Sequence, residues 1–193
     1  MANKDLEIAL IGDDDGTILK LLAANKNYDN EELFENLMTR RFPSLLRLRN
    51  TERFLRRAES WKQFYLRMIR YISLLKEEYG ISYSPSYYGF NPEEFYNSLK
   101  AKKLSRETAN RLMLVATQME NRNLIEYFIS KGADDFNHAM ARAAKAGNMQ
   151  LVNFFISKGA DDWIEGYIWA VSGGNLNVVH FFENERIKAG IHW

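Results

Sequence analysis

Apolar residues recur every three to four positions along most of the chain, which is the spacing of an amphipathic α-helix. No segment shows the apolar–polar alternation of a half-buried strand. Helix starts are marked by two capping-box patterns, at 29–32 and 60–63, and by Asn91 followed by Pro92. The pattern therefore predicts an all-α protein, with N-terminal helices over 17–24, 29–37, 61–79 and from 91 onward.

The C-terminal part contains an internal repeat. The phrase Phe-Ile-Ser-Lys-Gly-Ala-Asp-Asp occurs at 128–135 and again at 155–162, an offset of 27 residues. Each repeat predicts two helices, as at 136–146 and 149–157, and Gly159 suits a left-handed helix stop. A fixed period of this length is typical of stacked helical repeats, which present a surface to another macromolecule.

The domain organisation follows from these patterns. Residues 1–80 are predicted to form a helical module, and 105–193 about three repeats packed as a short solenoid. Between them, 81–104 is predicted to be a linker and a connecting helix, because 81–90 is rich in Ser, Tyr, Pro and Gly and has no periodicity. The charged residues of 184–188 predict a solvated cap at the end of the last repeat.

Composition limits the class of protein. The 193 residues are 46% hydrophobic and contain no cysteine, which excludes a disulfide framework and a thiolate metal site. No stretch of 18 apolar residues predicts a membrane span, and charges interrupt the first apolar residues, unlike a secretory signal. We therefore expect an intracellular protein. Charge is uneven: residues 1–38 hold nine acids and three bases, and residues 39–70 hold ten bases and two acids.

The repeat resembles the ankyrin repeat. Ala143-Ala144-Lys145-Ala146-Gly147-Asn148 is similar to the ankyrin Ala-Ala-x-x-Gly-(His/Asn), and 152–161 to its Val/Ile-x-x-Leu-Leu-x-x-Gly-Ala-Asp. The Thr-Pro-Leu-His turn is replaced by 138–141, and the ankyrin period is about 33 residues. The resemblance implies an ankyrin-like helical solenoid that lacks most β-hairpin fingers. The repeat sequence is also similar to ankyrin repeats encoded by large DNA viruses of amoebae. This resemblance implies that the protein is located in the cytoplasm or nucleus of a host cell.

The N-terminal module resembles an F-box, on 14–26, 29–34 and 60–65. It departs from the F-box pattern in lacking an opening Leu-Pro, and Glu35 stands where a Trp is expected. The resemblance implies a substrate-recruiting subunit of a cullin-type ubiquitin ligase, bound to a Skp-type adaptor. The alternative is that these apolar side chains belong to the core. The adaptor-binding residues would be Ile18, Leu19, Leu22, Phe34 and Leu37.

Two surfaces are candidates for binding. Protein partners would contact the variable positions of the first helices and turns of the repeats, which are Gln118, Met119, Lys145, Ala146, Trp169 and Ser172. The rival function is nucleic-acid or chromatin binding, because phosphate contacts need clustered basic residues on one face. The alternative is a solvated basic face that pairs with the acidic first residues. The candidate phosphate-binding residues are Arg49, Arg53, Arg56 and Arg57.

No motif predicts catalysis. His138, His180 and His192 are far apart in the sequence, without the spacing of a metal site, and are expected at the surface or in repeat packing. The acidic run 13–15 lacks the glycine and the distal Glu of a calcium loop, and no phosphate-binding loop occurs. We therefore predict a non-enzymatic protein-binding module with no cofactor, metal or small-molecule substrate.

Overall fold

The computed structural model describes residues 15–25, 28–43, 45–46, 59–84, 86–87 and 89–191. Over these residues the chain forms ten α-helices and no strand, which confirms the all-α prediction. None of the helices in this part of the chain is long and apolar enough to cross a membrane. The helices are α2 (Asp15–Ala24), α3 (Glu31–Arg41), α5 (Trp61–Tyr79), α6 (Pro92–Lys100), α7 (Arg106–Gln118), α8 (Arg122–Ser130), α9 (Phe136–Ala146), α10 (Met149–Ser157), α11 (Trp163–Gly173) and α12 (Leu176–Lys188).

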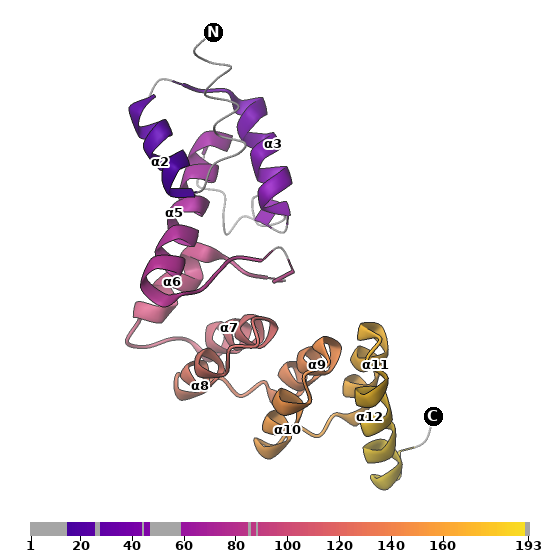
Figure 1. Cartoon of the computed structure of the whole chain (residues 1–193). Coiled ribbons are helices and arrows are strands. Elements are labelled where there is room, and N and C mark those ends of the chain that lie inside the picture. The colour runs from indigo at the N-terminus through magenta and orange to yellow at the C-terminus, as the bar shows by residue number, and fades with distance from the viewer. Residues whose placement is uncertain are drawn as a thin grey trace. The chain divides into compact units, whose positions relative to one another are not determined.

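The chain divides into two compact units, Met1–Ala101 and Lys102–Trp193, which we describe separately. In the first unit, α2 and α3 both pack against α5 (Figure 1). Burial of one face of each helix removes their apolar side chains from water, which is the main stabilising contribution to this unit. The core consists of Ile18, Leu22, Phe34, Leu37, Met38, Phe42, Leu45, Phe64, Tyr65, Met68, Ile69 and Ile72.

Local signals in the sequence fix the helix ends of this unit. Ser60 and Gln63 form the predicted capping box, in which each side chain accepts the other residue's backbone N–H at 3.1 Å. Gly80 ends α5 in the left-handed conformation, at φ 66°. At α3 the cap is Asn30, whose side chain accepts from Leu33 N, so the predicted capping box over 29–32 is replaced by a single Asn cap.

The segment predicted as a linker is packed against the first unit. Ile81 and Phe90 are buried, and the Phe90 ring lies 5.4 Å from that of Phe95 on α6. In turn α6 packs against α5. The boundary between the units therefore lies at 101–102, inside the predicted range 81–104, and the segment before it belongs to the first unit.

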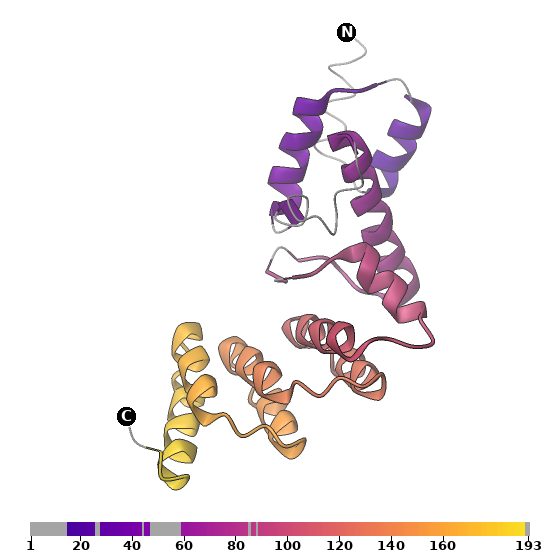
Figure 2. The ribbon, with the colours of Figure 1, turned by 180° about the vertical axis from the view of Figure 1, so that it is seen from behind.

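The second unit consists of three consecutive helix pairs, α7/α8, α9/α10 and α11/α12. The first helices of the pairs lie in one row, with α9 between α7 and α11, and the second helices lie in another row (Figures 1 and 2). The bounds of α9 and α10 match the predicted ones. Ala139 and Ala143, both fully buried, let neighbouring first helices approach closely, because an alanine side chain adds little bulk.

The third pair departs from the pattern of the first two. Where earlier repeats have Gly132 and Gly159 in the left-handed conformation after the second helix, the third has Arg186. The helix does not stop there, and α12 runs to Lys188, 13 residues against 9 for α8 and α10. The predicted solvated cap is only partly observed, because α11 and α12 also expose large apolar side chains such as Ile168 and Leu176.

Candidate functional site

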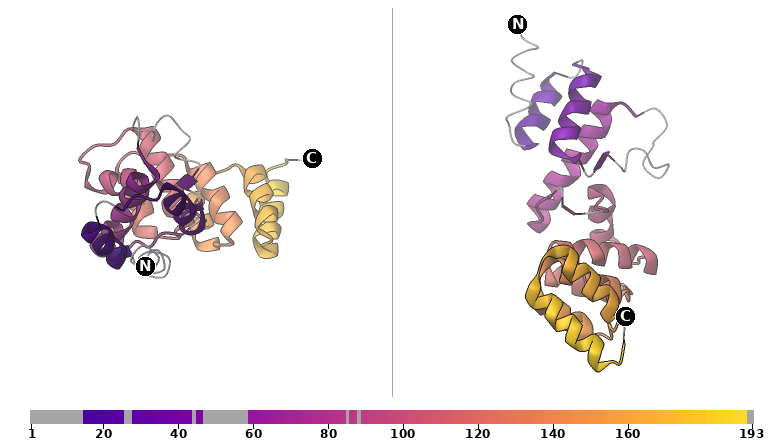
Figure 3. Two further views of the ribbon diagram at one scale, coloured as in Figure 1. Left: turned by 90° about the horizontal axis from the view of Figure 1, so that it is seen from above. Right: turned by 90° about the vertical axis from the view of Figure 1, so that its right-hand side faces the viewer.

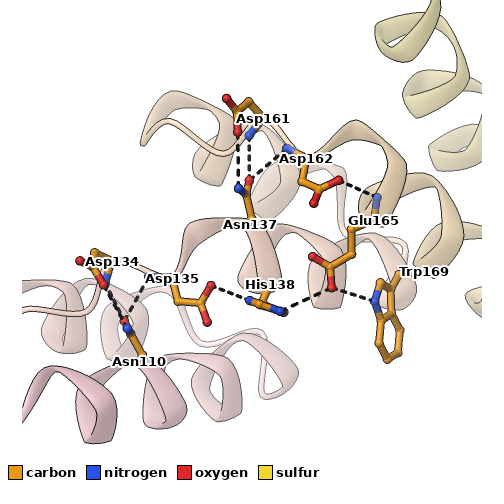
Figure 4. Close-up of polar contacts among 9 residues, drawn as sticks. All are labelled: Asn110, Asp134, Asp135, Asn137, His138, Asp161, Asp162, Glu165 and Trp169. Atoms are coloured by element: carbon orange, nitrogen blue, oxygen red, sulfur yellow. Dashed lines mark hydrogen bonds and ion pairs between the residues drawn. The ribbon is translucent and has the colours of Figure 1, made fainter. Parts of the chain in front are cut away.

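An asparagine on the first helix of a repeat holds the loop that leads into the next repeat (Figure 4). Asn110 Oδ1 accepts from the backbone N–H groups of Asp134 at 2.7 Å and Asp135 at 3.1 Å, and its Nδ2 donates to the Asp134 carboxylate at 3.0 Å. Residue 137, another asparagine 27 positions later, makes the same three contacts to Asp161 and Asp162. The acidic loops are therefore fixed in place before each following first helix.

His138, near the start of α9, lies between two carboxylates. His138 Nδ1 lies 2.7 Å from Asp135 Oδ1, and its Nε2 lies 3.7 Å from Glu165 Oε1 on the next repeat. The hydrogen bond to Asp135, followed by the charges of Asp135 and Glu165, raises the pKa of His138 above its usual value, against the opposing effects of partial burial and Arg142. The two carboxylates therefore stabilise the charged form of the imidazole relative to that of a free histidine.

The carboxylate of Glu165 also accepts a hydrogen bond from a tryptophan. Trp169 Nε1 donates to Glu165 Oε1 at 3.3 Å (Figure 4), and Lys145 Nζ lies 4.9 Å from the centre of the Trp169 ring. A cation at this distance from an indole face is attracted by the ring's electron density. Asp135, His138, Glu165, Trp169 and Lys145 thus form a continuous set of contacts across α9 and α11, which we call the charged track.

The structure brings together two of the six residues predicted for the repeat face. Lys145 and Trp169 contact one another from adjacent repeats. Ala146 and Ser172 are exposed at the C-terminal ends of α9 and α11. At the equivalent end of α7, Gln118 and Met119 are half-buried.

Sequence reasoning placed His138 only at the surface or in repeat packing, and it did not select Glu165. His138 is in fact exposed, on 61% of its side chain, and takes its partners from two repeats. Two local signals were present: the spacing of three residues between Asp135 and His138 at the start of α9, and the spacing of four between Glu165 and Trp169 on one face of α11. Only the contact between His138 and Glu165, which joins two repeats, depends on how the pairs stack.

The residues predicted to bind an adaptor lie in the core. Ile18, Leu22, Phe34 and Leu37 are each no more than 3% exposed, and Leu19 packs half-buried against the same cluster. Their burial supports the alternative interpretation, that they are core residues. The reason is that α5 covers the apolar faces of both α2 and α3.

The candidate phosphate-binding residues Arg49, Arg53, Arg56 and Arg57 lie outside the described residues, so their role stays a prediction. Two nearby bases in the described part have partners within the first unit. Arg67 donates to Glu59 and Glu93 at 2.6–2.8 Å, and Lys62 donates to a backbone carbonyl. A shallow depression of about 280 Å³ is lined by Arg67, whose charge is balanced by these carboxylates, and by Arg70.

No group of three or more His, Asp or Glu side chains within the described ranges is placed to bind a metal ion. No protein-family model matches this chain, and no curated protein or solved structure is similar to it. The charged track is therefore interpreted from its own geometry. It offers an aromatic surface and fixed charges of both signs, which are features of surfaces that recognise another molecule.

Proposed function

We propose that the protein is a non-enzymatic protein-binding module and that the charged track is its partner-binding surface. The observation that carries the proposal is the contact between Lys145 and Trp169, which places a half-buried aromatic ring and a cation from two repeats on one surface. Tryptophan is among the residues that contribute most to protein interfaces, because it buries a large apolar area and keeps a hydrogen-bond donor.

The side chains of the track are ordered before any partner arrives. Glu165 is held by Trp169 and lies close to His138, and Asp135 sits in a loop fixed by Asn110. Each immobilised side chain otherwise costs about 0.5–1.5 kcal/mol on binding, so a surface already in place saves part of this cost. The alternation of acidic and basic groups favours a folded protein with complementary charges over a polyanion.

The proposal is tested by affinity purification from a cell lysate, with amoebal lysate first because of the viral resemblance. The bait is the full chain, compared with Trp169→Ala and Lys145→Glu. We expect a common set of proteins to bind the unmodified chain and to be lost from both variants, with a fall in affinity of about 30-fold or more for Trp169→Ala.

Two matched controls separate binding from stability. Asn153→Ala changes an exposed residue on α10, and Lys103→Glu reverses an exposed charge at the start of the second unit. Both should retain the partner set, and all four variants should keep the helical circular dichroism spectrum. If every protein bound by the unmodified chain is also bound by Trp169→Ala, the charged track is not the binding surface.

The finer function, recruitment of substrates to a cullin-type ubiquitin ligase in a viral host cell, is proposed on the resemblance alone. It needs an adaptor surface other than the one predicted, since Ile18, Leu22, Phe34 and Leu37 are buried. The same purification tests it: Skp-type adaptor and cullin peptides should accompany the unmodified chain and should persist with Trp169→Ala, because that residue lies in the other unit.

A further inference from the structure

Exposed apolar side chains gather on the last helix pair of the second unit. Six large apolar side chains are exposed among the described residues, and five of them belong to α11 and α12. Exposed apolar side chains gather in this way at interaction sites of folded proteins. The five are Ile164, Ile168, Val171, Leu176 and Ile187.

On α11 these residues occupy the positions that face the next repeat elsewhere in the stack. Ile168 and Val171 lie 27 residues after Ala141 and Ala144 on α9. Those alanines are at most 1% exposed, on the helix against which α11 packs, whereas Ile168 and Val171 are about half exposed. The end of the unit formed by α11 and α12 faces the viewer in Figure 3, right, and no other helix of the unit lies in front of it.

On α12 the exposed face has an ordered chemistry. Leu176, His180, Glu183 and Ile187 follow one another at spacings of four, three and four residues, which places them on one face of a helix. Leu176, His180 and Ile187 are exposed and Glu183 is half-buried, and His180 Nδ1 lies 3.8 Å from Glu183 Oε2. The four positions are symmetric about a point between residues 181 and 182. Leu176 and Ile187 lie at equal distances from this point along the helix, and so do His180 and Glu183, which can form a complementary pair.

This order fits a second copy of the same helix. When two copies of α12 lie antiparallel about a two-fold axis through that point, Leu176 faces Ile187 of the second copy, and His180 faces its Glu183. Each contact occurs twice, as in any isologous interface. A parallel arrangement would place histidine on histidine and glutamate on glutamate, which is unfavourable.

We propose that the α11/α12 end is a self-association surface, through which two copies of the chain pair with their α12 helices antiparallel. The outer apolar residues provide burial, and the central His180–Glu183 contacts set the direction of the helices. The partner is thus identified by charge complementarity. The proposal does not use the charged track, so either can fail without the other.

Sedimentation equilibrium of the full chain tests the proposal. We expect a monomer–dimer equilibrium within about 10–200 µM, the weak end of protein association. Leu176→Asp should raise the dimer Kd by about 30-fold or more, because it places a charge in the apolar contact. His180→Glu and Glu183→Lys should each raise the Kd about tenfold, since the first places two carboxylates opposite one another twice and the second removes the carboxylate that His180 faces twice.

The decisive measurement mixes these two single variants. In the mixed dimer, Glu at 180 faces Lys at 183, and His180 faces Glu183, so the Kd should return to within about threefold of that of the unmodified chain. The contact between His180 and Glu183 within one helix is lost in both variants, and mixing does not restore it, so a mere loss of helix stability would not be rescued. A chain that stays monomeric to about 200 µM, or variants that mixing does not rescue, would overturn the proposal in favour of another occupant or none.

Discussion

The side chain of Asn137 contacts both the backbone and the side chain of Asp161. Asn137 Oδ1 accepts the Asp161 N–H at 2.8 Å, and Asn137 Nδ2 lies 3.4 Å from the Asp161 carboxylate. The two residues are 24 positions apart, in adjacent repeats, as are Asn110 and Asp134. One side chain thus satisfies backbone donors that a turn leaves without a helical partner. In the third repeat, Ile164 stands at the position of Asn110 and Asn137, so this contact is not repeated there.

We expect Asn137→Ala to lower the free energy of unfolding of the second unit by about 0.5–1.5 kcal/mol, because two exposed backbone N–H groups exchange a fixed acceptor for water. Urea denaturation followed by circular dichroism measures the change. Asn153→Ala on α10, an exposed asparagine, is the matched control and should stay within about 0.5 kcal/mol of the unmodified chain. Equal losses in the two variants would show that the contact between repeats contributes no specific stability.

Packing inside the third pair depends on a glycine beside a phenylalanine. A Cβ added at Gly166 would lie 2.2 Å from Cε1 of the Phe182 ring, which is fully buried. Gly166→Ala gains about 1 kcal/mol of helix propensity, but the overlap forces a buried ring to move at a cost of about 1–3 kcal/mol. We expect a net loss of stability, measured by thermal unfolding.

A double-mutant cycle identifies the cause. In the Phe182→Leu background, where the ring is absent, Gly166→Ala should be neutral or stabilising, because only the propensity term remains. If Gly166→Ala costs the same in both backgrounds, contact with the Phe182 ring is not the reason for the loss.

The fold was largely predictable because its determinants are local. Helix ends depend on nearby residues, and the cap at Ser60 and the left-handed stop at Gly80 are found where they were predicted. The repeated sequence likewise placed α9 and α10 at their observed bounds. Predictions of exposure failed where the answer depends on a distant helix. The leucines of α2 carry an amphipathic pattern that suits a surface groove as well as a core, and only the packing of α5 decides between them.

The candidate site was less predictable for the same reason. Asn121, Asn148 and Asn175 share one phase of the repeat. The first two do cap their helices, but Asn175 makes no cap contact and instead donates to Lys145 O of the preceding repeat at 2.8 Å. Which partner a side chain finds depends on the stacking of the pairs, and a single period does not encode that stacking.

In the first unit, a half-buried arginine joins three segments of the chain. Arg67 Nη2 lies 2.7 Å from Glu59 Oε2, and Arg67 Nη1 lies 2.6 Å from Glu93 Oε2, with 12% of the arginine side chain exposed. These hydrogen bonds raise the pKa of Arg67 despite its burial, so the guanidinium stays charged. The pair ties the N-terminus of α6 to α5.

We expect Arg67→Met to lower the free energy of unfolding of the first unit by up to about 3–5 kcal/mol, because two poorly solvated carboxylates lose the positive charge of Arg67. Arg67→Lys should recover only part of the loss, since one ammonium does not reproduce the forked contacts to Glu59 and Glu93. Urea denaturation of both variants ranks their free energies of unfolding, and Arg70→Met, at an exposed position, is the control. A Lys variant as stable as the unmodified chain would show that charge alone, without the geometry of the fork, is sufficient.

The charged track makes the stability of the second unit depend on pH. Because Asp135 and Glu165 raise the pKa of His138, the folded protein holds the imidazole proton more tightly than the unfolded chain, where a histidine titrates near about 6.5. The resulting stabilisation is fully present below about pH 6.5 and is lost as the pH rises through the folded pKa. The gain should be only a few tenths of a kcal/mol, since His138 is well exposed and solvent screens its ion pairs.

An NMR titration of the His138 ring protons tests the direction without relying on this small free energy. The midpoint should lie above that of a histidine in a denatured peptide, and Asp135→Asn should lower it more than Glu165→Gln, because Asp135 makes the shorter contact, at 2.7 Å against 3.7 Å. His138→Gln should remove the pH dependence of unfolding between about pH 6 and 8 that this site contributes. If the midpoint falls below that of the denatured peptide, partial burial outweighs the two carboxylates, and His138 enters the charged track as a neutral ring.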